Sequence, residues 1–202
     1  SCCRPGKPGP GFGSIRLMSN PRWSPSVTVA AIVEQGGRYL LVEEQTPEGL
    51  RLNNPAGHLD PGESLVQGAV REALEETARD FHPEALLGVY LSRFQRAAAD
   101  GSVGQDITYL RFAFAGTVGE PIPGRSLDRE IVRTLWMSLD EARACRGRHR
   151  SPLLLQCLED HAAGRRYPLE ALTAHPSLFA PYGLDGTIEL SPTAVTPRRG
   201  GG

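Results

Sequence analysis

Residues 57–79 read GHLDPGESLVQGAVREALEETAR, and the order of glycine, arginine and glutamate in this stretch carries most of the information in the chain. A helix turns by about 100° per residue. Apolar side chains between residues 64 and 77 then fall on one side, which is the usual core face of a helix. Glu72, Glu75 and Glu76 fall together on the other side, as neighbours spaced by three and four residues.

Three like charges on one helical turn repel one another, and each pair destabilises a helix by roughly 0.2–0.5 kcal/mol. A cation among the glutamates would relieve that repulsion. Hard oxygen ligands without His or Cys favour magnesium or manganese over zinc, and magnesium commonly shares its ligands with substrate phosphates. The alternative is a solvated acidic face that Arg71 and Arg79 partly neutralise.

The residues upstream extend this pattern into a longer signature. A glycine is followed after five residues by a glutamate, and after seven more by Arg-Glu, two residues and Glu-Glu. The positions are Gly57, Glu63, Arg71, Glu72, Glu75 and Glu76. In this register the sequence resembles the Nudix hydrolase superfamily. That resemblance implies an α/β (α+β) fold in which a mixed β-sheet is sandwiched between helices.

The resemblance also implies a role for each matched residue. Glu75 and Glu76 are expected to be the main magnesium ligands, with Glu72 as a third. The backbone carbonyl of Gly57 is expected to complete the metal site.

Two further matched residues, Glu63 and Arg71, are expected to fix the loop before the helix against the helix itself.

Two positions depart from the family pattern. Ala78 stands where the family has a glycine, and Arg79 stands where it has an apolar residue. A glycine there suits a left-handed helix end. Alanine should therefore cost on the order of 1 kcal/mol or shift the helix end by a residue.

Similarity outside the signature points to the NudJ-type phosphatases within this superfamily. It covers most of residues 27–175 and is clearest at residues 54–60, 109–112, 150–153 and 166–170. The resemblance implies release of inorganic phosphate from thiamine diphosphate, hydroxymethylpyrimidine diphosphate, or nucleoside di- and triphosphates. Two alternatives stay open: another Nudix substrate such as ADP-ribose, and a Nudix module that binds a nucleotide without cleaving it.

Several residues are candidates for binding the organic part of the substrate. Arg51 is expected to lie against it, together with aromatic side chains and Arg111 of the 109–112 segment. A small polar pocket is expected near Arg166 and Tyr167. His58 follows the loop glycine, where it would contact the substrate or act as a structural loop histidine.

Asp128 and Glu130 precede the strand that ends at Trp136, where Nudix enzymes often place an extra metal ligand or base. A solvated turn is the alternative. The expected mechanism uses one to three magnesium ions and a water molecule that attacks phosphorus. Glu130, or one of the helix glutamates, would be the base that takes the proton of that water.

Around the signature, alternating apolar residues and turn signals predict a layered domain of strands and helices. The pair Gly36-Gly37 predicts a hairpin turn. Ser138 and Ser151 fit the N-caps of two helices, and Gly164 fits a helix stop. The expected strands are residues 27–33, 39–43, 85–94, 107–117 and 133–137.

Composition predicts one domain at residues 27–176 between two disordered tails, residues 1–26 and 177–202. Met18 is a candidate for the true start of translation. The net charge is -1, which disfavours a nucleic acid polymer as partner. The basic run at residues 143–150 is interpreted as a solvated loop.

No apolar stretch is long enough to predict association with a membrane. The four cysteines do not follow a zinc or disulfide pattern, so the cytoplasm is the expected compartment. The expected assembly is a monomer or homodimer that acts on a small-molecule diphosphate.

Overall fold

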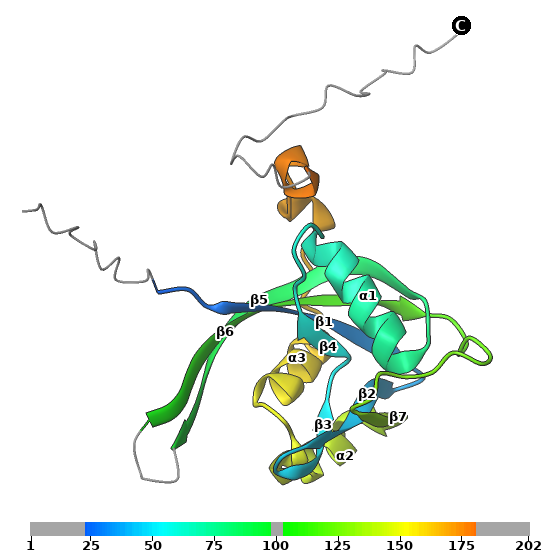
Figure 1. The fold of residues 1–202 in the computed structure, drawn as a ribbon. Helices are drawn as coiled ribbons and strands as arrows, with labels where there is room; N and C mark the ends of the chain where they lie inside the picture. Colours follow the sequence, from blue (N-terminus) through cyan, green and yellow to red (C-terminus); the bar gives the residue numbers. More distant parts are fainter. Residues whose placement is uncertain (1–22, 98–102, 181–202) are drawn as a thin grey trace, which may run out of the picture.

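The computed structural model describes residues 23–97 and 103–180, which form a curved mixed sheet with helices on both faces (Figure 1). The predictions for Met18, for the first two cysteines and for most of the C-terminal segment fall outside these residues. The fold class expected from the sequence is confirmed.

The sheet is built around β1 (Ser26–Gln35), which pairs in parallel with β6 (Val103–Val118). On its other side β1 pairs antiparallel with β4 (Ala56–His58), a strand of three residues. β5 (Phe81–Ala97) extends β6 as a long antiparallel hairpin that reaches beyond the rest of the sheet (Figure 1). These four strands carry one wall of the candidate site.

The second part of the sheet begins where the end of β1 turns into β2 (Arg38–Thr46). Gly36 and Gly37 make this turn with φ of 59° and 80°, a conformation that glycine adopts without strain. β2 pairs with β3 (Gly49–Asn53) and with β7 (Ile131–Ser138). The hairpin predicted at the two glycines is therefore confirmed.

Alternation along β1 divides the core into two layers, because successive side chains of a strand point to opposite faces. Val29 and Ala31 pack toward α1 (Leu65–Thr77), whereas Ala30 and Ile32 pack toward α3 (Leu153–Ala162). The two helices cover opposite faces of the sheet (Figure 1). A shorter helix, α2 (Leu139–Ala144), follows β7.

Local capping explains where the helices begin. Ser64 accepts the Gln67 N–H at 3.2 Å, and the Gln67 side chain accepts the Ser64 N–H at 2.8 Å, so α1 opens with a capping box. Ser138 and Glu141 form the same motif at α2, as predicted. At α3 the N-cap position falls on Pro152 rather than on the predicted Ser151, although the Ser151 hydroxyl still accepts the Leu153 N–H at 3.2 Å.

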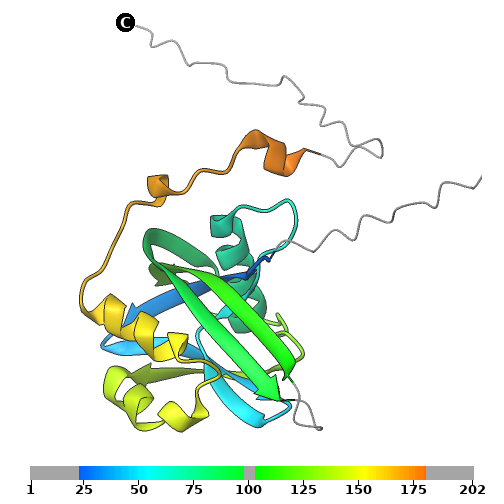
Figure 2. The same cartoon turned by 90° about the vertical axis from the view of Figure 1, so that its left-hand side faces the viewer.

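Several elements differ from the sequence prediction. β3 and β4 were not predicted, because they are too short to show an alternating pattern. β5 and β6 are longer than the predicted segments, because their paired backbones continue beyond the apolar residues. After α3 the chain forms two short 3-10 helices, Leu169–Ala171 and Pro176–Phe179, on the outside of the layered body (Figure 2). The second of these crosses the boundary expected at residue 177.

No helix in the described part of the chain is long and apolar enough to cross a membrane.

The end of α1 is strained at the position where the sequence departs from the family pattern. Ala78 adopts the left-handed conformation with φ 53° and ψ 30°, and its N–H donates to the Leu74 carbonyl at 3.0 Å. Alanine therefore does not shift the helix end but bears the cost of this backbone geometry, roughly 1–2 kcal/mol.

Replacing Ala78 with glycine should raise the free energy of unfolding by about 0.5–1 kcal/mol, because relief of the left-handed strain outweighs the loss of one buried methyl group. Ala163 ends α3 with φ of −74°, so Ala163→Gly is the matched control and should be destabilising. Chemical denaturation of the two variants measures both changes. Equal destabilisation by both would contradict the prediction.

Candidate active site

The site begins where β4 passes the acidic face of α1. A Cβ atom on Gly57 would lie 2.2 Å from the carboxylate carbon and both oxygens of Glu72, far inside van der Waals contact. Only glycine therefore lets the β4 backbone lie directly against this glutamate. The glycine of the signature is explained by close approach rather than by a special backbone angle.

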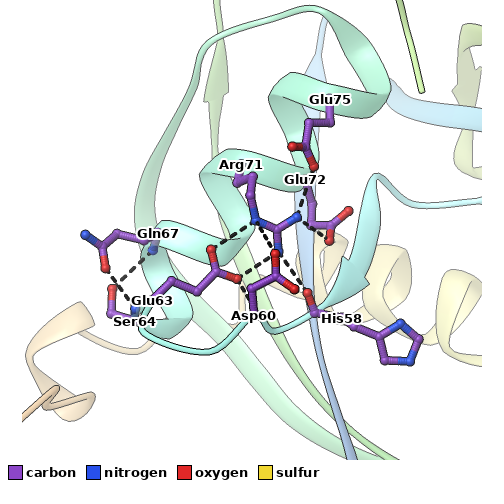
Figure 3. Close-up of polar contacts among 8 residues, drawn as sticks. All are labelled: His58, Asp60, Glu63, Ser64, Gln67, Arg71, Glu72 and Glu75. Carbon is purple, nitrogen blue, oxygen red and sulfur yellow. Dashed lines mark hydrogen bonds and ion pairs between the residues drawn. The ribbon is translucent and has the colours of Figure 1, made fainter. Parts of the chain in front are cut away.

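Arg71 joins the loop before α1 to the acidic face of the helix (Figure 3). Its Nε and Nη2 donate to the two Glu63 oxygens at 3.0 and 2.7 Å, and Nη2 also donates to the His58 carbonyl at 2.9 Å. Its Nη1 donates to Glu72 at 2.8 Å and to Glu75 at 3.0 Å. All five N–H donors of the guanidinium are thus engaged.

The charges of this cluster adjust to one another. The Arg71 guanidinium lowers the pKa of Glu63, which also accepts the Asp60 N–H at 2.8 Å. In return, the Glu63 carboxylate raises the pKa of Arg71. The pairing of Glu63 with Arg71 that the resemblance implied is therefore present, and it ties loop to helix by charge-assisted hydrogen bonds.

The expectation that all three glutamates lie opposite the core face is wrong for Glu72 and Glu76. Both are only 8% exposed, because they flank the buried stripe of α1 and lie against β4. Glu76 accepts the Ala56 N–H at 2.8 Å. Burial raises the pKa of Glu76 to about 8 and also raises the pKa of Glu72. Glu75 is the most accessible of the three.

The donor chemistry of this face fits a hard divalent cation. Glu72, Glu75, Glu76 and the Gly57 carbonyl offer only oxygen, and the raised pKa of Glu76 indicates too little nearby positive charge for a buried carboxylate. Across residues 23–97 and 103–180, no three His, Cys, Asp or Glu side chains already converge as a metal site. Arg71 instead binds one oxygen of Glu72 and one of Glu75.

A cavity of about 600 Å³ opens beside the acidic face. Its walls come from β4, from the ends of β5 and β6, from the β2–β3 hairpin and from the start of α3. Of the sequence-predicted residues, the structure brings seven to this cavity: Arg51, Gly57, His58, Glu72, Glu76, Arg111 and Glu130. Glu75 faces Arg71 and is not part of the lining.

Arg166 and Tyr167 do not line this cavity, so the structure does not bring them to the acidic face of α1; Tyr167 instead lines a separate cavity of about 360 Å³ along β5. Tyr167 exchanges two backbone hydrogen bonds with Leu86 at the outer edge of β5, at 2.8 and 2.9 Å. The Arg166 guanidinium donates to the carbonyls of Arg165 and His161. Tyr167 therefore fastens the segment after α3 to the sheet, whereas Arg166 ties this segment back to the end of α3.

The loop before β7 carries Asp128 and Glu130, the two candidates for an extra metal ligand or base, and places them differently. The Asp128 N–H donates to the Glu75 carbonyl at 3.0 Å, which ties the loop to the last turns of α1. The Glu130 carbonyl accepts the Gln45 N–H at 2.8 Å, and its side chain reaches the cavity. Asp128 is absent from the lining. Glu130 thus lines the cavity, whereas the Asp128 charge lies close enough to Glu72 and Glu76 to contribute to their raised pKa.

Sequence reasoning missed an ion pair on the opposite wall. Glu44 is buried in β2, and one of its oxygens accepts from Arg150 at 2.6 Å while the other has no hydrogen-bond partner in the described residues. Burial raises the pKa of Glu44. Arg148 likewise pairs with Glu43. The basic run at residues 143–150 is therefore partly a set of buried-carboxylate partners and not simply a solvated loop.

The described part of the chain matches known proteins over most of its length. The family model of the NUDIX domain matches residues 23–157. The phosphatase NudJ of Escherichia coli K12 is 34% identical over 150 residues, which are 74% of this chain and 92% of that protein.

Solved structures agree with this assignment. A NUDIX hydrolase from Nitrosomonas europaea is 50% identical, covers 75% of this chain and 98% of its own, and superposes with a TM-score of 0.64. A MutT NUDIX hydrolase from Burkholderia pseudomallei shares the fold at 22% identity, with a TM-score of 0.52 over 68% of this chain and 98% of its own. The signature in register, the mixed sheet and these matches lead to one conclusion: the chain belongs to the Nudix hydrolase family.

Proposed function

We propose that this Nudix hydrolase is a magnesium-dependent phosphatase that releases inorganic phosphate from small-molecule diphosphates. Thiamine diphosphate, hydroxymethylpyrimidine diphosphate and nucleoside di- and triphosphates are the proposed substrates. The observation that carries this proposal is the placement of Glu72 and Glu76, two buried carboxylates on the wall of a cavity of about 600 Å³. The 34% identity to the phosphatase NudJ supports the choice of reaction within the family.

Glu72, Glu75, Glu76 and the Gly57 carbonyl would hold magnesium, with manganese as a substitute. When bound, the cation supplies positive charge against the phosphoryl oxygens and makes the attacking water more acidic. Arg71 holds Glu72 and Glu75 in fixed rotamers through its Nη1 atom, so these ligands need little reordering.

The other wall of the cavity supplies the base and the substrate contacts. Glu130 lines the cavity and would accept the proton of the attacking water, whereas Asp128 holds the loop through its backbone. The organic group would lie between His58 and the end of the β5–β6 hairpin, where Tyr109 lies 6.2 Å from the His58 ring. Arg51 stands at the same opening, with Nη1 bonded to the Gly147 carbonyl at 2.9 Å.

Hydrolysis of thiamine diphosphate should be lost in excess chelator and restored by magnesium or manganese, because the one arginine seen on the acidic face among the described residues, Arg71, has all its donors bonded to protein oxygens and a metal must neutralise the phosphoryl group there. Phosphate release with and without chelator measures the effect. Full activity in excess chelator would refute the magnesium dependence.

Glu76→Gln should lower turnover by about 100-fold or more, since it removes a charged ligand but keeps the shape and the acceptor for the Ala56 N–H. The melting temperature in chelator should not fall, because the substitution removes a carboxyl group whose ionisation is disfavoured by burial. The matched control is Glu120→Gln, whose carboxylate is 95% exposed and lies outside the cavity. Wild-type turnover in Glu76→Gln would exclude Glu76 as a metal ligand.

The site of attack can be read from the product. Hydrolysis in oxygen-18 water should place the label in inorganic phosphate, and a nucleoside triphosphate should lose single phosphates. Mass spectrometry of the phosphate and of the organic product locates the label. Label confined to the organic monophosphate, with diphosphate released from a triphosphate, would instead indicate a pyrophosphatase.

A further inference from the structure

Arg111 is a buried cation in the floor of the cavity. It lies in β6 between Thr28 of β1 and Tyr90 of β5, and it is 8% exposed. Its Nε and Nη1 atoms have no hydrogen-bond partner in the described residues, and no ion pair of the described residues includes it. Burial lowers the pKa of Arg111, which is the direction expected for a guanidinium removed from water.

The groups that face Arg111 are already engaged or uncharged. Glu44 pairs with Arg150, and Glu76 accepts the Ala56 N–H. Burial raises the pKa of the Cys157 thiol to about 12, so this neighbour stays neutral near pH 7. Glu76 and Glu44 lie close enough to favour the Arg111 charge, but neither forms an ion pair with it in the described residues, so its guanidinium keeps buried N–H donors that an anion from outside would satisfy.

A second unpaired group lies beside Arg111. Thr28 pairs with Arg111 in the parallel β1–β6 register, so both side chains project from the same face of the sheet. Thr28 is 5% exposed, and its hydroxyl has no partner in the described residues. Both residues line the cavity whose other wall carries Glu72 and Glu76.

We propose that Arg111 and Thr28 bind a phosphoryl group of the substrate, next to the phosphoryl group that the acidic face of α1 receives. This inference rests on the proposed function and makes it more specific. A guanidinium can donate two parallel hydrogen bonds to phosphate oxygens, and burial strengthens such bonds. The pair would make the enzyme selective for substrates with two adjacent phosphoryl groups, and the binding of a monophosphate product would be weaker.

A purely structural role for Arg111 predicts the opposite effect on stability. If Arg111 served only to offset the charges of Glu44 and Glu76, its removal would destabilise the ligand-free protein. If Arg111 forms an ion pair only with a bound substrate anion, replacing it with an apolar side chain of similar length removes a charge that is unpaired in the ligand-free protein. Arg111→Met should then leave the ligand-free melting temperature unchanged or raise it.

The test uses methylenediphosphonate, whose P–C–P link is not a substrate for hydrolysis, titrated calorimetrically into the full chain with magnesium chloride. Arg111→Met should weaken its binding by at least about tenfold, the loss expected for a charge-assisted hydrogen bond. Arg111→Lys keeps the charge but loses the two parallel guanidinium donors, so its affinity for methylenediphosphonate should lie between those of the wild type and Arg111→Met. Thr28→Val should weaken binding by a smaller factor. Arg38→Gln is the control, because Arg38 is 48% exposed and pairs with Glu141 away from the cavity.

Unchanged affinity for methylenediphosphonate in a folded Arg111→Met or Arg111→Lys protein would overturn the inference. The inference would also be overturned if Arg111→Met lowered the ligand-free melting temperature while Arg111→Lys kept both the wild-type melting temperature and the wild-type affinity. A positive charge alone would then explain the role of residue 111.

The proposed function and the role of Arg111 fail in different ways. If the wild-type protein binds the diphosphonate through Arg111 but releases no phosphate from any diphosphate, only the proposed function is wrong. If it hydrolyses thiamine diphosphate and Arg111→Met leaves KM unchanged, only the role of Arg111 is wrong.

Discussion

The geometry of the acidic face depends on the hydrogen bonds of the Arg71 guanidinium. One side chain binds the loop through Glu63 and the His58 carbonyl, and the helix through Glu72 and Glu75. Without it, Glu72 and Glu75 would repel each other and lose their fixed orientation, whereas Glu76 is held by the Ala56 N–H. Its donors are all occupied, so it sets the orientation of the loop and of two glutamates together. The close approach of β4 is compatible with this arrangement only because residue 57 is glycine.

Beyond this cluster, the cavity is lined by charges that the protein itself does not satisfy. Among the described residues, Glu76 has a raised pKa, one oxygen of Glu44 has no hydrogen-bond partner, and two nitrogens of the Arg111 guanidinium have none either. Burial of such groups disfavours the ligand-free fold, so their presence together on one cavity is informative. A magnesium ion at the carboxylates and a phosphoryl group at the guanidinium would satisfy them jointly. The same desolvation that destabilises the empty site would strengthen both contacts.

The topology of the sheet is what brings these groups together. The parallel pairing of β1 with β6 places Thr28 beside Arg111, while the antiparallel pairing of β1 with β4 places Thr28 beside His58. Two strands from distant parts of the chain thus extend the loop of the signature into a continuous floor. The long β5–β6 hairpin forms a further wall beside the β2–β3 hairpin and the start of α3, and the apolar layers under α1 and α3 support the floor from both faces of the sheet.

Local features of the sequence determined the helix from Leu65 to Thr77, the turn at Gly36-Gly37 and the spacing of the glutamates, because capping and periodicity involve residues only a few positions apart. Tertiary structure alone decided which of these carboxylates are buried, that Arg111 reaches the cavity, and that Arg166 and Tyr167 do not. It also decided the pairing of Glu44 with Arg150, 106 positions apart in the chain. Such contacts follow from strand register and layer packing, which bring together segments whose spacing along the chain carries no local signal.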